Sequence, residues 1–340
     1  MNHSSRLRFV VVIAVLALAL LALAVGCLLW GSVDIDASAI ATIVTGGSSG
    51  NPAWDTIILK TRLPMIATAA LAGAALSVAG LLLQTTFNNP LAGPSILGVS
   101  TGAGLGVAVV MLALGGTLGD GLGGYMATLL GAVLGAGAVL AVLMLFSTIV
   151  RSSTLLLIIG ILVSYLASSV ISLLNSVATE EGLHSYVAWG FGSFEGVSVD
   201  QLPLFSAVIV AALVAALFMV KPLNALLLGT RYARNLGVDT FRTRNILLLI
   251  TGVLTAVVTA FCGPIGFLGL VVPHVARMAL GTSNHNRLLP ATILAGAVVA
   301  LLCSLLSVVS PYGFIPINAI TPIIGVPIII YVILNRNARL

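Results

Sequence analysis

Ten apolar runs follow one another along this 340-residue chain, separated by short polar connections. A helix needs roughly 20 apolar residues to cross the hydrocarbon core of a bilayer. Measured against that length, the runs predict membrane spans at 9–31, 63–86, 95–114, 122–146, 154–174, 202–220, 245–262, 266–280, 290–309 and 318–334. We therefore expect an all-α integral membrane protein with about ten transmembrane helices, built as a single transmembrane domain over residues 1–340.

The composition supports this interpretation. Hydrophobic residues make up 59% of the chain and charged residues only 7%, whereas a soluble domain carries roughly 25% charged residues. The 36 glycines are spread through the apolar runs, which is typical of membrane helices that pack closely through small residues. The basic residues occur singly rather than in a basic and aromatic patch, so nucleic acid is not an expected partner.

The N-terminal apolar run, residues 9–29, is 21 residues long, whereas the apolar region of a signal peptide has about 7 to 15 residues. We therefore interpret it as the first span. A weak similarity to a lipoprotein cleavage site around Cys27 remains as an alternative.

The distribution of charge predicts the orientation. Ten spans place both termini on one side of the membrane, and short loops rich in Lys and Arg face the cytoplasm. Twelve of the 14 basic residues fall on the side of the termini, and only Lys60 and Arg62 fall opposite, together with eight of the nine acids. We therefore expect both termini in the cytoplasm.

Several classes of function lack their usual residues. No acid and no Lys lies in the middle of a predicted span, although ion-coupled secondary transporters often place carboxylates there. The chain has no phosphate-binding G-x-x-x-x-G-K-[ST] loop, no H-E-x-x-H zinc pair and no G-x-S-x-G nucleophile motif. Cys27, Cys262 and Cys303 show no paired spacing, so neither a disulfide nor a metal site is expected. If the chain pumps a solute, the energy comes from a partner.

Two short segments are similar to each other. Gly93 to Gly98 opens the third span and Gly263 to Gly269 opens the eighth, and in the predicted topology they run in opposite directions. Inverted repeats that meet at interrupted helices recur in transporters, so spans 2–5 and 7–10 are a possible inverted repeat. Pro273 in the eighth span, and Pro322 and Pro327 in the tenth, predict broken or kinked helices there.

The largest loop on the terminus side, residues 221–244, contains four arginines. It predicts one or two small helices under the membrane, although a solvated loop that only fixes the topology would look similar. Residues 228–237 of this loop read L-G-T-R-Y-A-R-N-L-G. They match L-G-x-x-x-A-x-x-L-G and resemble the coupling loop of permease subunits in the iron-siderophore, haem and cobalamin family of bacterial ABC importers.

Further motifs of this family occur in the same order over nearly the whole chain. They are R-L-P at residues 62–64, Q-T-T-F-N-N-P-L-A-G-P-S-I-L-G at 84–98, G-P-I-G-F-L-G-L-V-V-P-H-V-A-R at 263–277 and G-V-P at 325–327. The joint order is specific, so the chain is identified by resemblance as a permease subunit of this family. The alternatives are a secondary transporter or channel without an ATPase, or a membrane enzyme or assembly factor.

The resemblance implies partners and a function. A similar permease forms a homodimer, binds two cytoplasmic ATPase subunits and receives substrate from an extracytoplasmic binding protein. It carries no cofactor and no catalytic site itself, since ATP and Mg bind the ATPase. It would move an iron-siderophore, haem or cobalamin across the bacterial inner membrane into the cytoplasm by alternating access. Iron chelates are favoured here only because they are the commoner substrates of the family.

The resemblance also implies site residues. Those of ATPase coupling are Leu228, Gly229, Arg231, Ala233, Arg234, Leu236 and Gly237. Those of binding-protein docking are Lys60 and Arg62, although Met65 stands where a second arginine is usual. Those of the cytoplasmic gate are Asn89, Leu91, Ser152 and Ser153. Ser164, Ser168 and Ser172 follow a helical spacing that suits either a pore face or helix packing.

Overall fold

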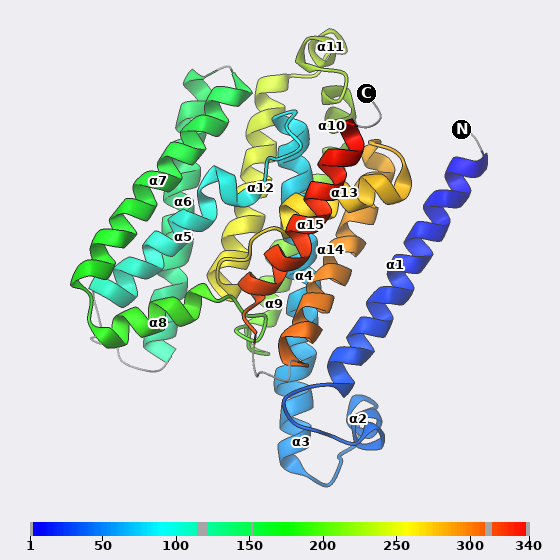
Figure 1. Ribbon diagram of the computed structural model, residues 1–340, viewed down its shortest axis with the longest axis vertical. Coiled ribbons are helices and arrows are strands. Elements are labelled where there is room, and N and C mark those ends of the chain that lie inside the picture. The colour runs from blue at the N-terminus through cyan, green and yellow to red at the C-terminus, as the bar shows by residue number, and fades with distance from the viewer. Residues whose placement is uncertain (1–2, 114–121, 151, 310–314, 338–340) are drawn as a thin grey trace.

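The computed structural model describes residues 3–113, 122–150, 152–309 and 315–337, and every regular element in these ranges is a helix (Figure 1). The first half contains α1 (His3–Leu29), α2 (Ala37–Val44), α3 (Pro52–Ile57), η1 (Ile58–Arg62), α4 (Leu63–Thr86), η2 (Pro94–Leu97), α5 (Val99–Ala108), η3 (Val109–Ala113), α6 (Leu122–Ile149) and α7 (Ser153–Val177). The second half contains α8 (Glu180–Gly190), α9 (Leu202–Phe218), α10 (Val220–Leu226), α11 (Thr230–Asn235), α12 (Thr240–Cys262), α13 (Leu268–Leu280), α14 (His285–Val308) and α15 (Ile317–Asn337).

The apolar helices coincide with the predicted spans. Six helices of the described chain are long and apolar enough to cross a membrane, and α9 with α10 makes a seventh, bent by 54°. Three shorter apolar helices cover Val99–Ala113, Leu268–Leu280 and Ile317–Tyr331. These ten units confirm the prediction of an all-α integral membrane protein. The predicted third span ends at residue 114, which lies outside the described ranges.

Helix α4 is the axis of the bundle. It continues α3 and η1 as one long rod and packs against α9, α12, α13 and α14. The approach to α13 is so close that a Cβ on Gly80 would overlap the backbone carbonyl of Gly269. Small residues allow such contacts in membranes, where lipid supplies no hydrophobic drive between helices. A second core joins α5, α6 and α7 through buried residues such as Val107, Ala136 and Leu156.

Helix α13 runs continuously through Pro273, and α15 through Pro322 and Pro327. The expectation of broken or kinked helices is therefore wrong as to a break at these prolines, while a kink there stays a prediction. The break instead precedes α13, where Phe267 has a φ of 64°. Here the two similar segments meet, because a Cβ on Gly269 would lie 2.6 Å from Cδ of Pro94. The inverted repeat itself stays a prediction.

The two ends of the bundle differ. The start of α1, the end of α15, α10 and α11 lie at one end, and α2, α3 and α8 lie at the other (Figure 1). We call these the α11 end and the α8 end. At the α11 end, Arg8 donates from Nε to the carbonyl of Ala279 at 2.7 Å, and Arg287 from Nη1 to that of Ser5 at 2.9 Å. These arginines hold α1 against α13 and α14.

Candidate functional site

The predicted coupling loop forms the tip of the α11 end. Helix α10 continues α9 after the 54° bend, and α11 follows three residues later. Gly229 and Gly237 flank α11 with φ values of 95° and 82°, which residues with a side chain rarely adopt. Gly237 ends the helix in a Schellman turn, in which Val238 N donates to the Ala233 carbonyl at 3.0 Å. The two glycines of the motif therefore set the ends of α11.

The surface of this tip is both apolar and basic. Leu228 and Leu236 are 60% and 64% exposed, while Ala233 is fully buried beneath the helix. Arg231 and Arg234 are exposed, and Arg234 also donates from Nε to the Thr240 hydroxyl at 3.0 Å. Exposed apolar side chains beside cations are typical of a surface that another protein covers.

Tyr232 was not among the residues predicted from the sequence, and it is 68% exposed on α11. The motif leaves this position open, so the motif gave no signal. The aromatic side chain beside two arginines was the available clue, since Tyr and Arg are enriched at the centres of protein interfaces. We therefore add Tyr232 to the candidate coupling surface.

The predicted gate residues lie in two turns at the α11 end. Helix α4 ends in a second Schellman turn, in which Asn88 has a φ of 45° and Asn89 N donates to the Gln84 carbonyl at 3.1 Å. The Asn89 side chain accepts from Leu91 N at 2.9 Å, and Leu91 itself is 46% exposed. These contacts define a tight turn, and its role as a gate stays a prediction.

The second turn precedes α7. Ser152 caps this helix, its hydroxyl oxygen accepting from Leu155 N at 3.3 Å, and Ser153 is the first helical residue. Capping accounts for Ser152 without any further role. The gate assignment of both serines stays a prediction.

The serines of α7 have different surroundings. Ser164 donates to the Gly160 carbonyl at 2.8 Å and lies against Gly98, the break before α5, so it takes part in helix packing. Ser168 and Ser172 are exposed on the open face of α7, and Ser172 donates to the Ser168 carbonyl at 3.0 Å. Of the three candidates, these two have the exposure that a pore lining requires.

The two predicted docking residues differ in how exposed their side chains are. Lys60 is exposed at the α8 end, but Arg62 is only 4% exposed. The Arg62 guanidinium donates to the carbonyls of Leu28, Leu29 and Val33. These carbonyls belong to the last turn of α1 and the segment after it, where a helix leaves acceptors unsatisfied. Arg62 therefore fastens α1 to the α4 rod and is not available at the surface of this chain. Its docking role stays a prediction.

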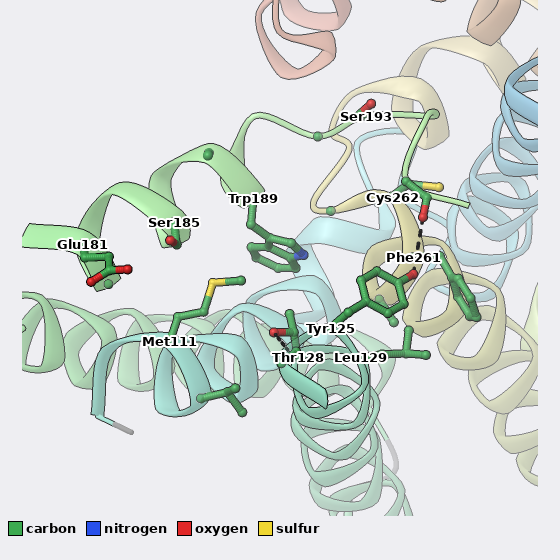
Figure 2. A pocket seen from close by; sticks show the side chains of 18 residues that line it. Met111, Tyr125, Thr128, Leu129, Glu181, Ser185, Trp189, Ser193, Phe261 and Cys262 are labelled. Atoms are coloured by element: carbon green, nitrogen blue, oxygen red, sulfur yellow. Dashed lines mark hydrogen bonds between the residues drawn. The ribbon is translucent and has the colours of Figure 1, made fainter. Parts of the chain in front are cut away.

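A cavity of about 620 Å³ lies at the α8 end, between η3, α6, α8 and the end of α12 (Figure 2). Figure 2 shows Trp189, Tyr125 and Phe261 around it, with Met111 and Glu181 toward one side. The Tyr125 hydroxyl already bonds Gly196 and Gln201, at 3.3 and 3.1 Å. The cavity therefore offers mainly aromatic and apolar surface.

Within the described part of the chain, no group of three or more His, Cys, Asp or Glu side chains could hold a metal ion. Ten packed apolar helices with an exposed basic tip at one end define the class as a polytopic membrane protein.

Comparison with known proteins makes the class specific. The profile of the FecCD transport family matches residues 15–335. Vitamin B12 import system permease proteins BtuC of Salmonella paratyphi A, Salmonella typhi and Salmonella newport are each 36% identical over 284 residues, covering 83% of this chain and 84% of theirs. The chain belongs to the FecCD transport family, which confirms the resemblance carried by its motifs.

A solved structure gives the same result for the fold. It is described as an inward-facing conformation of an ABC transporter assigned to the metal-chelate type. The match has a TM-score of 0.82 and 33% sequence identity, and covers 95% of this chain and 98% of the other. Because the relatives are permeases, the expected role in transport, rather than in catalysis, is confirmed.

Proposed function

We propose that the chain is the membrane-spanning subunit of an ATP-driven importer that carries a metal chelate into the cytoplasm. The family match carries this proposal. Among the chelates, we place cobalamin before iron-siderophore and haem, because the relatives are named for vitamin B12 import. This order reverses the one that the sequence favoured.

The exposed tip of α11 supports an ATPase partner. Leu228, Tyr232 and Leu236 together expose large, mainly apolar side chains at this tip, and Arg231 adds a cation. In the proposal, a groove on a cytoplasmic ATPase receives this tip. ATP and Mg bind that ATPase, and its closure moves α11.

The open face of α7 supports a homodimer. Only Leu156, Gly160 and Ala167 of this helix are buried. Leu166 and Leu173 lie seven positions apart on one face of the helix and are 67% and 68% exposed, while Ser168 and Ser172 are exposed on a different side. A second copy would cover part of this exposed surface, and the serines would border the path between the copies.

The α8 end supports docking of an extracytoplasmic binding protein. Lys60 is exposed there, so we assign the docking contact to Lys60 and give Arg62 a positioning role beneath it. This assignment follows the orientation predicted from charge, with both termini and α11 in the cytoplasm of a bacterial cell. A surface charge of this kind affects the rate and register of docking more than affinity.

Reconstitution tests the proposal against a secondary transporter or channel. The chain, the ATPase subunit of its transport system and the binding protein are placed in liposomes, and ATP hydrolysis is measured with cyanocobalamin, a ferric siderophore or haem. We expect hydrolysis to rise with the binding protein loaded with cyanocobalamin. Uptake that proceeds without the ATPase would establish the alternative instead.

A further inference from the structure

Two adjacent residues at the end of α4 bond to different helices. The Gln84 side chain accepts from Nη1 of Arg277 on α13 at 2.7 Å and donates to the Leu270 carbonyl at 3.2 Å. The Thr85 hydroxyl lies 2.9 Å from Nε2 of His285 at the start of α14. Gln84 and Thr85 are 4% and 7% exposed, and His285 is fully buried. The end of α4 is therefore a buried polar junction.

His285 extends this junction to α10. The amide oxygen of Asn224 accepts from the His285 backbone N at 2.8 Å and lies 3.1 Å from Nδ1. A carboxamide oxygen can only accept, so the imidazole proton lies on Nδ1 and Nε2 is an acceptor. Nε2 and the Leu81 carbonyl, which lies 3.0 Å from the Thr85 hydroxyl oxygen, share the single Thr85 hydroxyl proton. Asn224 Nδ2 also donates to Asn284, the cap of α14, at 3.2 Å. One side chain of α10 thus contacts both the first residue and the cap of α14.

Helix α10 is joined to the coupling tip by a short connection. Only residues 227–229 separate α10 from α11, and their amides continue the turns of α10, with Gly229 N donating to the Leu226 carbonyl at 3.0 Å. The two helices also pack against each other. Few rotatable bonds therefore separate α11 from Asn224, and we expect Asn224 to move when α11 moves.

The other end of the junction holds the turn after α4. The carbonyls of Gln84 and Thr85 accept from Asn89 N and Asn88 N, at 3.1 and 3.3 Å. His274 Nε2 on α13 lies 2.8 Å from the Pro90 carbonyl, so it bonds the same turn. Gln84 and Thr85 thus bond α13 and α14 through their side chains, and their backbone carbonyls hold the turn at residues 88–91.

From this arrangement we propose that Asn224, His285 and Thr85 form a relay that transmits the movement of α11 to the turn at residues 88–91. They are positioning residues for transport, because they touch neither nucleotide nor substrate. Buried hydrogen bonds suit this task, since breaking one leaves a polar group unsatisfied and its partners move together. The inference rests on the proposed function, because the movement begins at an ATPase.

The chain provides a matched pair that separates the relay from simple stabilisation. Thr85 and Thr86 are neighbours and both buried, and their hydroxyls bond carbonyls of α4, those of Leu81 at 3.0 Å and Leu82 at 2.7 Å. Only Thr85 also contacts His285. Thr85→Val and Thr86→Val therefore remove the same atoms and the same kind of local bond, but only the first interrupts the relay.

The readout is the accessibility of the turn, measured in the reconstituted complex with the partner ATPase. Leu91→Cys introduces an exposed thiol, while Cys27, Cys262 and Cys303 are buried. The rate of maleimide labelling is compared without nucleotide and with ATP and vanadate. We expect a change of about fivefold in the otherwise native chain and in Thr86→Val, as for a coupling of modest strength. It is expected to vanish in Thr85→Val and Asn224→Ala and to return in Thr85→Ser and Asn224→Asp.

The outcomes separate this inference from the function on which it rests. If Thr85→Val and Thr86→Val respond alike while the ATPase hydrolyses ATP in both, the relay is wrong and the proposed function is untouched. A turn whose labelling never follows the nucleotide, in a complex that hydrolyses ATP, also contradicts the relay. Failure of the native chain to bind the ATPase at all overturns both.

Discussion

Helices α4 and α7 have nearly the same length and similar hydropathy, yet they occupy opposite environments. In the rod that contains α4, 78% of an apolar stretch of 18 residues is buried, against 17% of the corresponding stretch in α7. Their sequences differ in how small residues are used. Gly73 and Gly80 of α4 lie against the backbones of α14 and α13, whereas few residues of α7 are buried within the described part of the chain. Hydropathy identifies a span, but contacts decide whether it forms the core or a surface for partners.

The largest expected effect comes from filling the closest contact of α4. Gly80→Leu would force α4 and α13 apart, because even a Cβ overlaps the Gly269 carbonyl. We expect destabilisation by more than about 4 kcal/mol and loss of folded protein in detergent. Gly137→Leu on α6 is the control, since a Cβ there meets nothing within 4 Å. Equal yields of the two variants by size-exclusion chromatography would contradict the packing.

The same substitution at two positions of α7 tests which part of that helix belongs to the core. Leu156 is fully buried, and Leu156→Ala is expected to cost about 2–5 kcal/mol. Leu166 is 67% exposed, so Leu166→Ala is expected to leave thermal unfolding of the monomer unchanged and to weaken the proposed homodimer. Light scattering measures the dimer. Equal destabilisation of the monomer by Leu156→Ala and Leu166→Ala would contradict the placement of Leu156 in the core and Leu166 at the surface.

Arg62 and Lys60 differ in the same way at the α8 end of the rod, since Arg62 is buried and Lys60 is exposed. Arg62→Ala removes the donor to three carbonyls and is expected to cost about 2–3 kcal/mol, measured by thermal unfolding. Lys60→Ala is expected to leave stability unchanged and to slow association of the binding protein about tenfold at low salt, measured by surface plasmon resonance. Unchanged docking kinetics in Lys60→Ala would refute its assignment.

A smaller and more local effect is expected at the coupling tip. Gly237→Val places a branched side chain at a φ of 82°, which costs about 1–3 kcal/mol of strain confined to the end of α11. The bundle stays folded, and affinity for the ATPase is expected to fall about tenfold, measured by titration of the purified subunits. Gly190→Ala in α8 serves as the control, because a Cβ there meets nothing within 4 Å. An ATPase that binds both variants equally would place the contact elsewhere.

The fold was largely predictable because its signals are local. Apolar length located the ten spans, and the paired glycines located both ends of α11. Arg62 was assigned to the surface because sequence shows its charge but not the carbonyls of Leu28 and Val33 that it meets. Likewise, the prolines of α13 and α15 predicted broken or kinked helices, and the helices are not broken there.

The polar junction had no local signal at all. Thr85 and His285 are 200 positions apart in the chain, and Asn224 and His285 are 61 apart. Threonine, histidine and asparagine are each common as isolated residues near helix ends. Only the packing of α4, α10 and α14 brings them together, so a single sequence could not reveal them.

In the proposed function, two copies of this chain form the membrane part of an importer, with an ATPase bound to each α11. The most direct test is the mass of the complex purified in detergent with the ATPase subunit of the same system, measured by multi-angle light scattering. We expect two copies of this chain with two of the ATPase, and a smaller share of ATPase-bound complex in Gly237→Val. A chain that remains monomeric and binds no ATPase would contradict it.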